Sequence, residues 1–226
     1  MNATLNSNIT FIGGGNMAQA LIGGLLARGL PTTRIMVSDP VEAIRQLLHE
    51  KEIQAVDDNV KAIKNADVVV LAVKPQVLGT VLKPLHGLFE GKLIVSIIAG
   101  AEIETIAALT GTDRVVRVMP NTPALVQTGA HGLYANENVT TKDRDLASQI
   151  LAATGLTIWV NSEAQIDAVT AVSGSGPAYF FYLMESMIRA GKNMGLDEKV
   201  ATALTLQTAS VSYTHLTLPT KRIVKI

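Results

Sequence analysis

Short apolar runs rich in β-branched residues alternate with helical patterns along the first two thirds of the chain, and this alternation restricts the fold most. The predicted strands are 9–12, 34–38, 67–73, 93–98, 114–119, 132–135 and 156–160, and the predicted helices are 17–28, 41–51, 60–65, 103–109 and 141–154. Strands that alternate with helices, several of them apolar throughout, are typical of a parallel sheet covered on both faces. We therefore expect a doubly wound α/β domain over residues 1–161.

The pattern changes near Asn161. From Glu163 onward the residues favour helix, with no strand signal until the last few positions, and Tyr179–Ala190 is a long apolar helical run. The sequence contains no internal repeat and no low-complexity linker. We expect a second, helical domain over residues 162–209.

Composition excludes several classes of protein. Apolar residues make up 48% of the 226 residues and charged residues 17%, which indicates a globular chain. Nineteen basic side chains balance nineteen acidic ones, so no basic stripe suggests a nucleic-acid partner. Cysteine is absent, which excludes disulfides and cysteine-based sites. The most apolar run, Val68–Val73, is too short to span a bilayer, and the polar N-terminus lacks a signal-peptide pattern. A cytoplasmic protein without a membrane partner is expected.

A glycine-rich turn follows the first predicted strand. Gly13-x-Gly15-x-x-Ala18 lies between a strand and a helix, where a dinucleotide phosphate-binding turn belongs. Gly13 permits a tight turn, Gly15 clears space for a pyrophosphate, and Ala18 allows the helix to approach the strand. The helix N-terminus adds N–H groups and a positive dipole end. The motif is short and a purely structural turn is the alternative, but its context favours a nucleotide site.

The ribose end of such a site lies at the end of the second predicted strand. Asp39 there could accept a bond from a 2′-hydroxyl and repel a 2′-phosphate, which would favour NAD. Ser38 could instead bond a 2′-phosphate, with help from Arg45 in the following helix. The sequence leaves NADPH and NADH both open.

Two further segments are candidates for cofactor contact. Lys74-Pro75 ends the strand 67–73, and ligands bind at the carboxyl ends of strands in such sheets. A solvated lysine at a strand end is an equal alternative. Asn59 precedes the helix 60–65, where an N-cap is the simpler interpretation and a ribose contact the other.

Two loops are candidates for substrate contact. Asn121-Thr122 lies between Pro120 and Pro123 in a rigid loop after the strand 114–119, so Asn121 is the best polar group to orient a substrate or a nicotinamide amide. Ser173-Gly-Ser-Gly-Pro177 precedes the apolar helix 179–190, and its hydroxyls and glycines suit an anionic group at a helix start. A plain turn or N-cap is the alternative for both loops.

No side chains of the usual acid–base or metal sites gather in the sequence. His49, His86, His131 and His215 are scattered, without a paired carboxylate or metal spacing, and we interpret all four as structural. This pattern fits hydride transfer, in which the cofactor carries the chemistry and the protein supplies position and electrostatics.

The four motifs at 13–18, 72–75, 119–124 and 167–179 together resemble the pyrroline-5-carboxylate reductase family, in order and spacing, over about residues 8–209. The resemblance implies a Rossmann-type domain followed by a helical dimerisation domain, and NAD(P)H-dependent reduction of 1-pyrroline-5-carboxylate to L-proline, the last step of proline synthesis. It implies cofactor contacts for Ile12, Gly13, Gly14, Gly15, Asn16, Met17, Ser38, Asn59, Ala72, Val73, Lys74 and Pro75. It places Asn121, Ser173, Gly174, Ser175, Gly176 and Pro177 near the substrate, and it implies no catalytic side chain and no metal.

The resemblance stops near Ser210. Residues 210–226 are rich in threonine and β-branched residues and contain Pro219, so they are not expected to continue an amphipathic helix. We interpret them as a non-native tail, from a frameshift or an adapter, on a truncated helical domain; a genuine divergent terminus is the alternative. This predicts an exposed apolar face at Tyr179–Ile188 and an impaired homo-oligomer. A fragment that binds cofactor without turnover, and a related imine or carbonyl reductase, are the alternative functions.

Overall fold

The computed structural model of the chain describes residues 6–217, with side chains as far as residue 210. The chain divides after Gly174 into two compact units. The predicted domain boundary after residue 161 instead coincides with the change from strand to helix, because β8 ends at Trp159 and α7 begins at Gln165.

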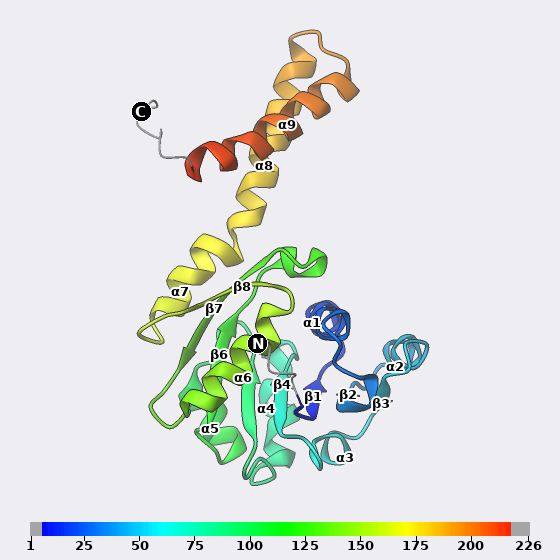
Figure 1. Cartoon of the computed structure of the whole chain (residues 1–226), viewed down its shortest axis with the longest axis vertical. Helices are drawn as coiled ribbons and strands as arrows, with labels where there is room; N and C mark the ends of the chain where they lie inside the picture. The colour runs from blue at the N-terminus through cyan, green and yellow to red at the C-terminus, as the bar shows by residue number, and fades with distance from the viewer. Residues whose placement is uncertain (1–5, 218–226) are drawn as a thin grey trace. The chain divides into compact units, whose positions relative to one another are not determined.

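The described part of the first unit is built on one eight-stranded sheet with the order β3-β2-β1-β4-β5-β6-β7-β8 (Figure 1). The strands are β1 Ile9–Ile12, β2 Ile35–Ser38, β3 Gln54–Val56, β4 Val68–Leu71, β5 Leu93–Ser96, β6 Val115–Met119, β7 Gly129–Ala135 and β8 Gly155–Trp159. Strands β1 to β6 are parallel and have the 3-2-1-4-5-6 order of a Rossmann fold. The predicted doubly wound α/β class is confirmed.

Three details of the sheet differ from the prediction. β7 runs antiparallel to β6, because the short connection at 120–128 turns the chain back without a crossover helix. β7 also begins at Gly129, earlier than predicted. The prediction began too late because Gly129-Ala-His131 carries no strand signal. The edge strand β3 was missed, since its three residues include only one β-branched side chain.

Helices cover both faces of the sheet, as Figure 1 shows. They are α1 Asn16–Ala27, α2 Glu42–His49, α3 Asn59–Ile63, α4 Leu78–Leu82, α5 Ile103–Thr110 and α6 Thr141–Ala152. Val68 and Val70 of β4 point into a core shared with α1, α2 and α6, whereas Val69 and Leu71 point into a core shared with α3, α4 and α5. Because each strand side chain is worth roughly 1.5–3 kcal/mol when buried, this two-sided burial holds β4 at the centre of the unit.

The start of α6 is fixed by a buried carboxylate. Thr140 and Asp143 form a reciprocal capping box, and Arg114 makes a bidentate contact with Asp143 at 2.6 and 2.9 Å. The hydrogen bonds from Arg114 and Thr140 hold the pKa of Asp143 below its usual range. The carboxylate therefore stays ionised and ties α6 to the strand β6, which follows Arg114 directly.

A second ion pair, with one buried partner, marks the end of the strand region. Arg117, on β6, contacts Glu163 at 3.0 Å, and Glu163 also accepts a bond from the N–H of Ile103 at the start of α5. These contacts fix the chain just before α7 (Gln165–Val169), which continues into a π-helical segment, Thr170–Gly174. The predicted turn at the Ser-Gly pairs is thus mostly helical, with a break at Ser175.

The second unit contains two helices in its described part, α8 Gly176–Asn193 and α9 Glu198–Thr217. Pro177 lies in the first turn of α8, as predicted. Gly195 has a φ of +97°, which ends α8, and Gly191 packs against Ala201 where α9 folds back. The prediction that residues after Ser210 leave the helix was wrong as far as Thr217; residues 218–226 lie outside the described part.

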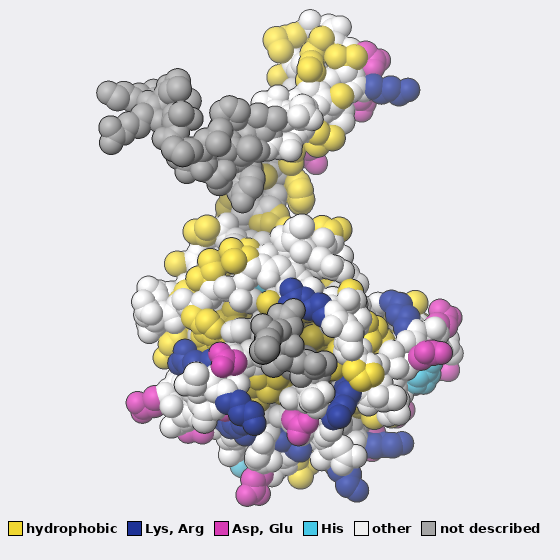
Figure 2. All heavy atoms as spheres, in the orientation of Figure 1, with side chains coloured by type: hydrophobic (Ala, Val, Ile, Leu, Met, Phe, Trp, Pro, Cys, Tyr) yellow, Lys and Arg dark blue, Asp and Glu magenta, His cyan; other side chains and the backbone are white. Residues whose placement is uncertain are grey.

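The first two turns of α8 carry a cluster of exposed apolar side chains. Figure 2 shows hydrophobic side chains on the surface of the second unit, where grey atoms do not cover it. The cluster consists of Tyr179, Phe180, Phe181, Tyr182 and Leu183, each more than half exposed in the single chain. The predicted exposure of this face is confirmed for these residues. Within residues 6–217, no helix has both the length and the apolar character that crossing a membrane requires.

Candidate functional site

The sheet order creates a crevice at one edge. β1 lies between β2 and β4, so the chain leaves β1 toward one neighbour and later returns on the other side. At such a switch point the loops after the two strands diverge and leave space above the carboxyl ends. A cleft of about 830 Å³ lies here. Of the predicted cofactor residues, seven line it: Ile12, Gly13, Gly15, Ser38, Asn59, Val73 and Lys74.

The first glycine of the turn is required by the protein itself. Gly13 has a φ of +100°, and a Cβ there would lie 2.6 Å from the carbonyl oxygen of Ala72. Its N–H donates to the carbonyl of Ser38, and the N–H of Ala72 donates to Ile12. The turn is therefore pinned against the ends of both neighbouring strands.

Contacts within the protein do not require a glycine at position 15, the third glycine of the turn. Gly15 has an ordinary φ of −67°, and a Cβ there would meet no heavy atom within 4 Å. Among the described residues, no side chain caps the start of α1, and its first turn contains no acidic residue. The N–H groups of that turn have no acceptor within the helix and form the positive end of the helix dipole. Gly15 thus leaves an open cradle suited to a phosphate group.

The other predicted cofactor residues are not part of the lining of the cleft. These are Gly14, Asn16, Met17, Ala72 and Pro75. Gly14 is covered by Ile44, whose methyl group would lie 2.8 Å from an added Cβ. Asn59 is the first residue of α3 and not its N-cap; Asp58 caps the helix by accepting a bond from the N–H of Lys61 at 3.0 Å. Asn59 is thereby left at the cleft.

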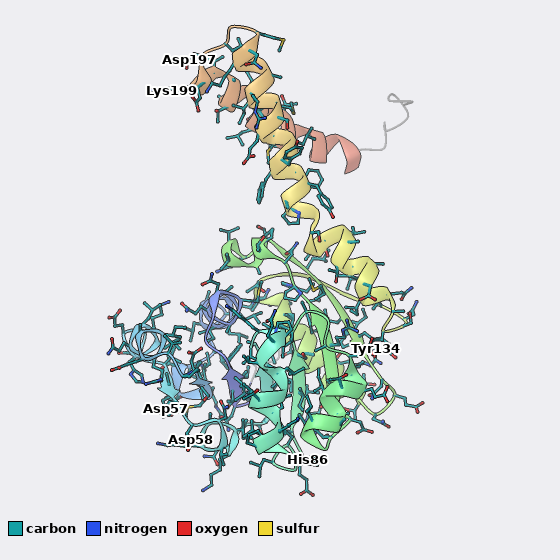
Figure 3. All side chains as sticks on the ribbon, turned by 180° about the vertical axis from the view of Figure 1, so that it is seen from behind. Asp57, Asp58, His86, Tyr134, Asp197 and Lys199 are labelled. Carbon is teal, nitrogen blue, oxygen red and sulfur yellow. The ribbon has the colours of Figure 1, made fainter. Side chains whose placement is uncertain are left out.

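Several lining residues were missed by sequence reasoning. Asp57, Asp58 and Val60 belong to the loop after β3 and the start of α3, and Figure 3 labels the two carboxylates there. Recognising β3 would have placed this loop at a strand end. The far wall comes from Thr80, Val81, Pro84 and Leu85, for which no motif gives a signal.

Asn121 is held by backbone groups on both sides. Its Oδ1 accepts a bond from the N–H of Ala130 at 2.8 Å, and its Nδ2 donates to the carbonyl of Ser173 at 3.0 Å. Gly174, next in the chain, packs against the methyl group of Met119. Asn121 is buried and does not line the cleft, so in this structure it joins the loop after β6 to the end of the π-helical segment.

The remaining predicted substrate residues follow the Ser173 carbonyl. The hydroxyl of Ser173 donates to the carbonyl of Val169, Ser175 precedes α8, and Gly176 and Pro177 form its first turn. The division between the units falls inside this segment, after Gly174.

Replacing Asn121 with aspartate is expected to destabilise the first unit by about 2 kcal/mol. The variant loses the donor to Ser173 and sets a carboxylate against a carbonyl oxygen, in a buried position. Urea unfolding measures the effect, and Asn161→Asp, at an exposed position, controls for the added charge. Equal stability of the two variants would contradict the role of Asn121 as a buried link.

Two family models match this chain, one in its N-terminal part and one in its C-terminal part. Residues 8–100 match a family model described as NADP oxidoreductase coenzyme F420-dependent, and residues 163–223 match one described as pyrroline-5-carboxylate reductase dimerisation. The second match extends over most of the predicted non-native tail.

Curated relatives and solved structures point to one family. A pyrroline-5-carboxylate reductase of Pseudomonas aeruginosa is 52% identical over 204 residues, which cover 89% of this chain and 75% of the relative. One of Haemophilus influenzae is 48% identical, covering 88% and 74%. The solved structure of a pyrroline-5-carboxylate reductase from Coxiella burnetii has a TM-score of 0.89 and 41% identity, covering 94% of this chain and 81% of that one. A Plasmodium falciparum pyrroline carboxylate reductase, solved with NADP bound, has a TM-score of 0.86 and 28% identity, covering 98% and 86%. This chain therefore belongs to the pyrroline-5-carboxylate reductase family.

Proposed function

We propose that this protein reduces 1-pyrroline-5-carboxylate to L-proline with NAD(P)H, the last step of proline biosynthesis. The observation that carries the proposal is the open cradle at Gly15, above the switch point of the sheet, in a chain 52% identical to a pyrroline-5-carboxylate reductase. The site combines a tight backbone turn, an uncapped helix start and a cleft of about 830 Å³, which suits an extended dinucleotide.

The residues of the cleft fit a dinucleotide along its length. The cradle at Gly15 and the start of α1 take the pyrophosphate, because they offer N–H groups and no competing side chain. Ser38 and Asn59 line the cleft at the ends of the β2 and β3 connections, where they take the adenosine ribose. Val73 and Lys74 follow β4 and lie on the opposite side of the switch point, toward the reacting end.

NADPH is the proposed physiological donor. Arg45 donates to the carbonyl of Asp39 at 2.8 Å, which keeps a guanidinium at the corner where a 2′-phosphate would lie. The NADP bound to the Plasmodium relative supports the same choice.

The chemistry needs little from the side chains. When bound, NAD(P)H supplies a hydride to the carbon of the substrate C=N bond. The imine nitrogen can arrive already protonated, so we assign no catalytic acid to this chain. The residues act by position: Asn121 holds the carbonyl of Ser173, and we assign the substrate carboxylate to the segment that begins there, Ser173–Pro177.

The proposed assembly is a homo-oligomer formed through the second unit. Residues 163–223 match the dimerisation region of the family, and the exposed apolar cluster at the start of α8 lies within it. Five neighbouring large apolar side chains in water are unfavourable, so a second copy of the chain is the natural cover.

Oxidation of NADPH with and without 1-pyrroline-5-carboxylate tests the function. Substrate-dependent loss of absorbance at the nicotinamide band, with formation of L-proline, is the expected result. Binding of NADPH without turnover would overturn the proposal and favour a protein that only binds the cofactor. Turnover of other cyclic imines, but not of this substrate, would indicate a different imine reductase.

A further inference from the structure

We propose that Asp39 is a positioning residue that holds the glycine turn in its binding shape, and that it does not discriminate between NADH and NADPH. The inference rests on the proposed binding of a dinucleotide. It concerns the acidic residue at the end of β2, a position where a carboxylate commonly bonds the ribose 2′-hydroxyl and repels a 2′-phosphate.

Both carboxylate oxygens of Asp39 are engaged by the backbone of the site. Oδ2 accepts a bond from the N–H of Gly14 at 2.8 Å, and Oδ1 accepts one from the N–H of Val41 at 2.9 Å. The first bond crosses from β2 to the turn after β1, and the second closes an Asx turn before α2. One side chain therefore ties together the two loops that form the wall of the cleft.

Both backbone polar groups of Asp39 also have hydrogen-bond partners. Its N–H donates to the carbonyl of Val56 on β3, and its carbonyl accepts from Nη1 of Arg45 at 2.8 Å. Asp39 is only 7% exposed, although it borders the cleft. A residue fixed at four polar positions, with so little surface, is poorly placed to accept a further bond from a ribose.

The bond from the Gly14 N–H to Asp39 explains how this side chain affects the glycine turn. Because Asp39 accepts that N–H, Gly14 turns its amide toward the sheet, and the turn leads directly to the open position at Gly15. Without the acceptor, the amide of Gly14 would be buried and unpaired, which favours a rearranged turn. The Asp39 side chain thus shapes the pyrophosphate cradle, which NADH and NADPH share. The bond from Arg45 goes to the backbone carbonyl of Asp39, which a change of the side chain leaves in place.

The test is Asp39→Asn, which keeps the shape of the side chain and replaces one acceptor with a donor. Dissociation constants for NADPH and NADH are measured by nicotinamide fluorescence. Both are expected to rise about tenfold, the usual effect of losing one hydrogen bond to a charged group, with their ratio unchanged. A weaker NADH complex with a tighter NADPH complex would instead identify Asp39 as a reader of the ribose and overturn the proposal. Unchanged affinities for both cofactors would also overturn it.

Two controls keep the result interpretable. Asp57→Asn removes the same charge from an exposed position on the same cleft, so it measures the charge effect without touching the turn. Hydrogen exchange at the Gly14 amide reads the turn without any cofactor. We expect it to be at least tenfold faster in Asp39→Asn, and in Asp39→Ser if the first variant fails to fold; unchanged exchange would contradict the role.

These readouts also separate the two proposals. A native chain that binds neither cofactor would refute the proposed function while leaving the exchange result at Gly14 to decide the role of Asp39.

Discussion

Valine in place of Gly15 is expected to weaken NADPH binding by on the order of 100-fold and to lower the stability of the protein by no more than about 1 kcal/mol, the cost of a poorer N-cap. The reason is that the protein does not need glycine at this position. A Cβ at Gly15 meets no heavy atom within 4 Å, and its φ of −67° suits a β-branched residue. The added methyl groups would fill the cradle that the pyrophosphate requires. Fluorescence titration with NADPH and urea unfolding give the two quantities.

Two other glycines, one in the same turn and one farther along α1, serve as controls. Gly23→Val adds the same side chain to an exposed position farther along α1, where a Cβ also meets nothing, so NADPH binding should stay normal. Gly13→Ala forces a Cβ to 2.6 Å from Ala72 at a φ of +100°, so both stability and binding should fall. Normal NADPH affinity in a folded Gly15→Val protein would exclude the cradle as the phosphate site.

The protein is expected to lose up to about 3 kcal/mol of stability through His131 as the pH falls from 6.5 to 4. Burial lowers the pKa of His131 from its usual 6.5 to about 4, and the contact with Thr154 opposes this only in part. His131 is 2% exposed, its Nε2 lies 3.0 Å from the Thr154 hydroxyl, and its Nδ1 has no partner within the described part of the chain. The folded protein therefore favours the neutral ring.

The sign of the effect follows from this lowered pKa. The unfolded chain takes up a proton below pH 6.5, whereas the folded chain does so only near pH 4, so the contribution of His131 is complete above 6.5 and disappears toward 4. Urea unfolding of the native protein and of His131→Gln between pH 7 and 4.5 measures it. The stability of the variant should change less with pH; parallel pH curves would contradict the buried neutral ring. The pKa of Asp143 is lowered, so the stability that this carboxylate contributes is lost only as the pH falls below the usual range of an aspartate.

The apolar runs were enough to predict most of the sheet. β4 and β5 are apolar on both faces because helices cover both sides, and such strands stand out in a sequence. β3 and the start of β7 could not be predicted in the same way, since Gln54 and Gly129-Ala130 extend only through pairing with a neighbouring strand. The antiparallel turn to β7 depends on a loop length, which residue patterns do not reveal.

The site was predictable in its glycines and less so in its polar groups. Gly13 and Gly15 were recognisable in the sequence: the turn requires glycine at position 13, and a ligand phosphate explains the glycine at position 15. Asn121 and Asp39 also stood out as polar residues at strand ends. Their partners are backbone groups of Ala130, Ser173, Gly14 and Val41. Because every residue has such groups, the sequence does not indicate which of them will be bonded. For both residues, the structure shows side-chain bonds to backbone groups, which their residue types could not distinguish from a contact with a ligand.

The most direct test of the proposed reaction uses NADPH with deuterium at both C4 positions and unlabelled 1-pyrroline-5-carboxylate. Mass spectrometry of the product should find L-proline with a single deuterium on Cδ, because the hydride moves directly from the nicotinamide to the imine carbon. Unlabelled proline, or consumption of NADPH without labelled proline, would contradict hydride transfer in this cleft.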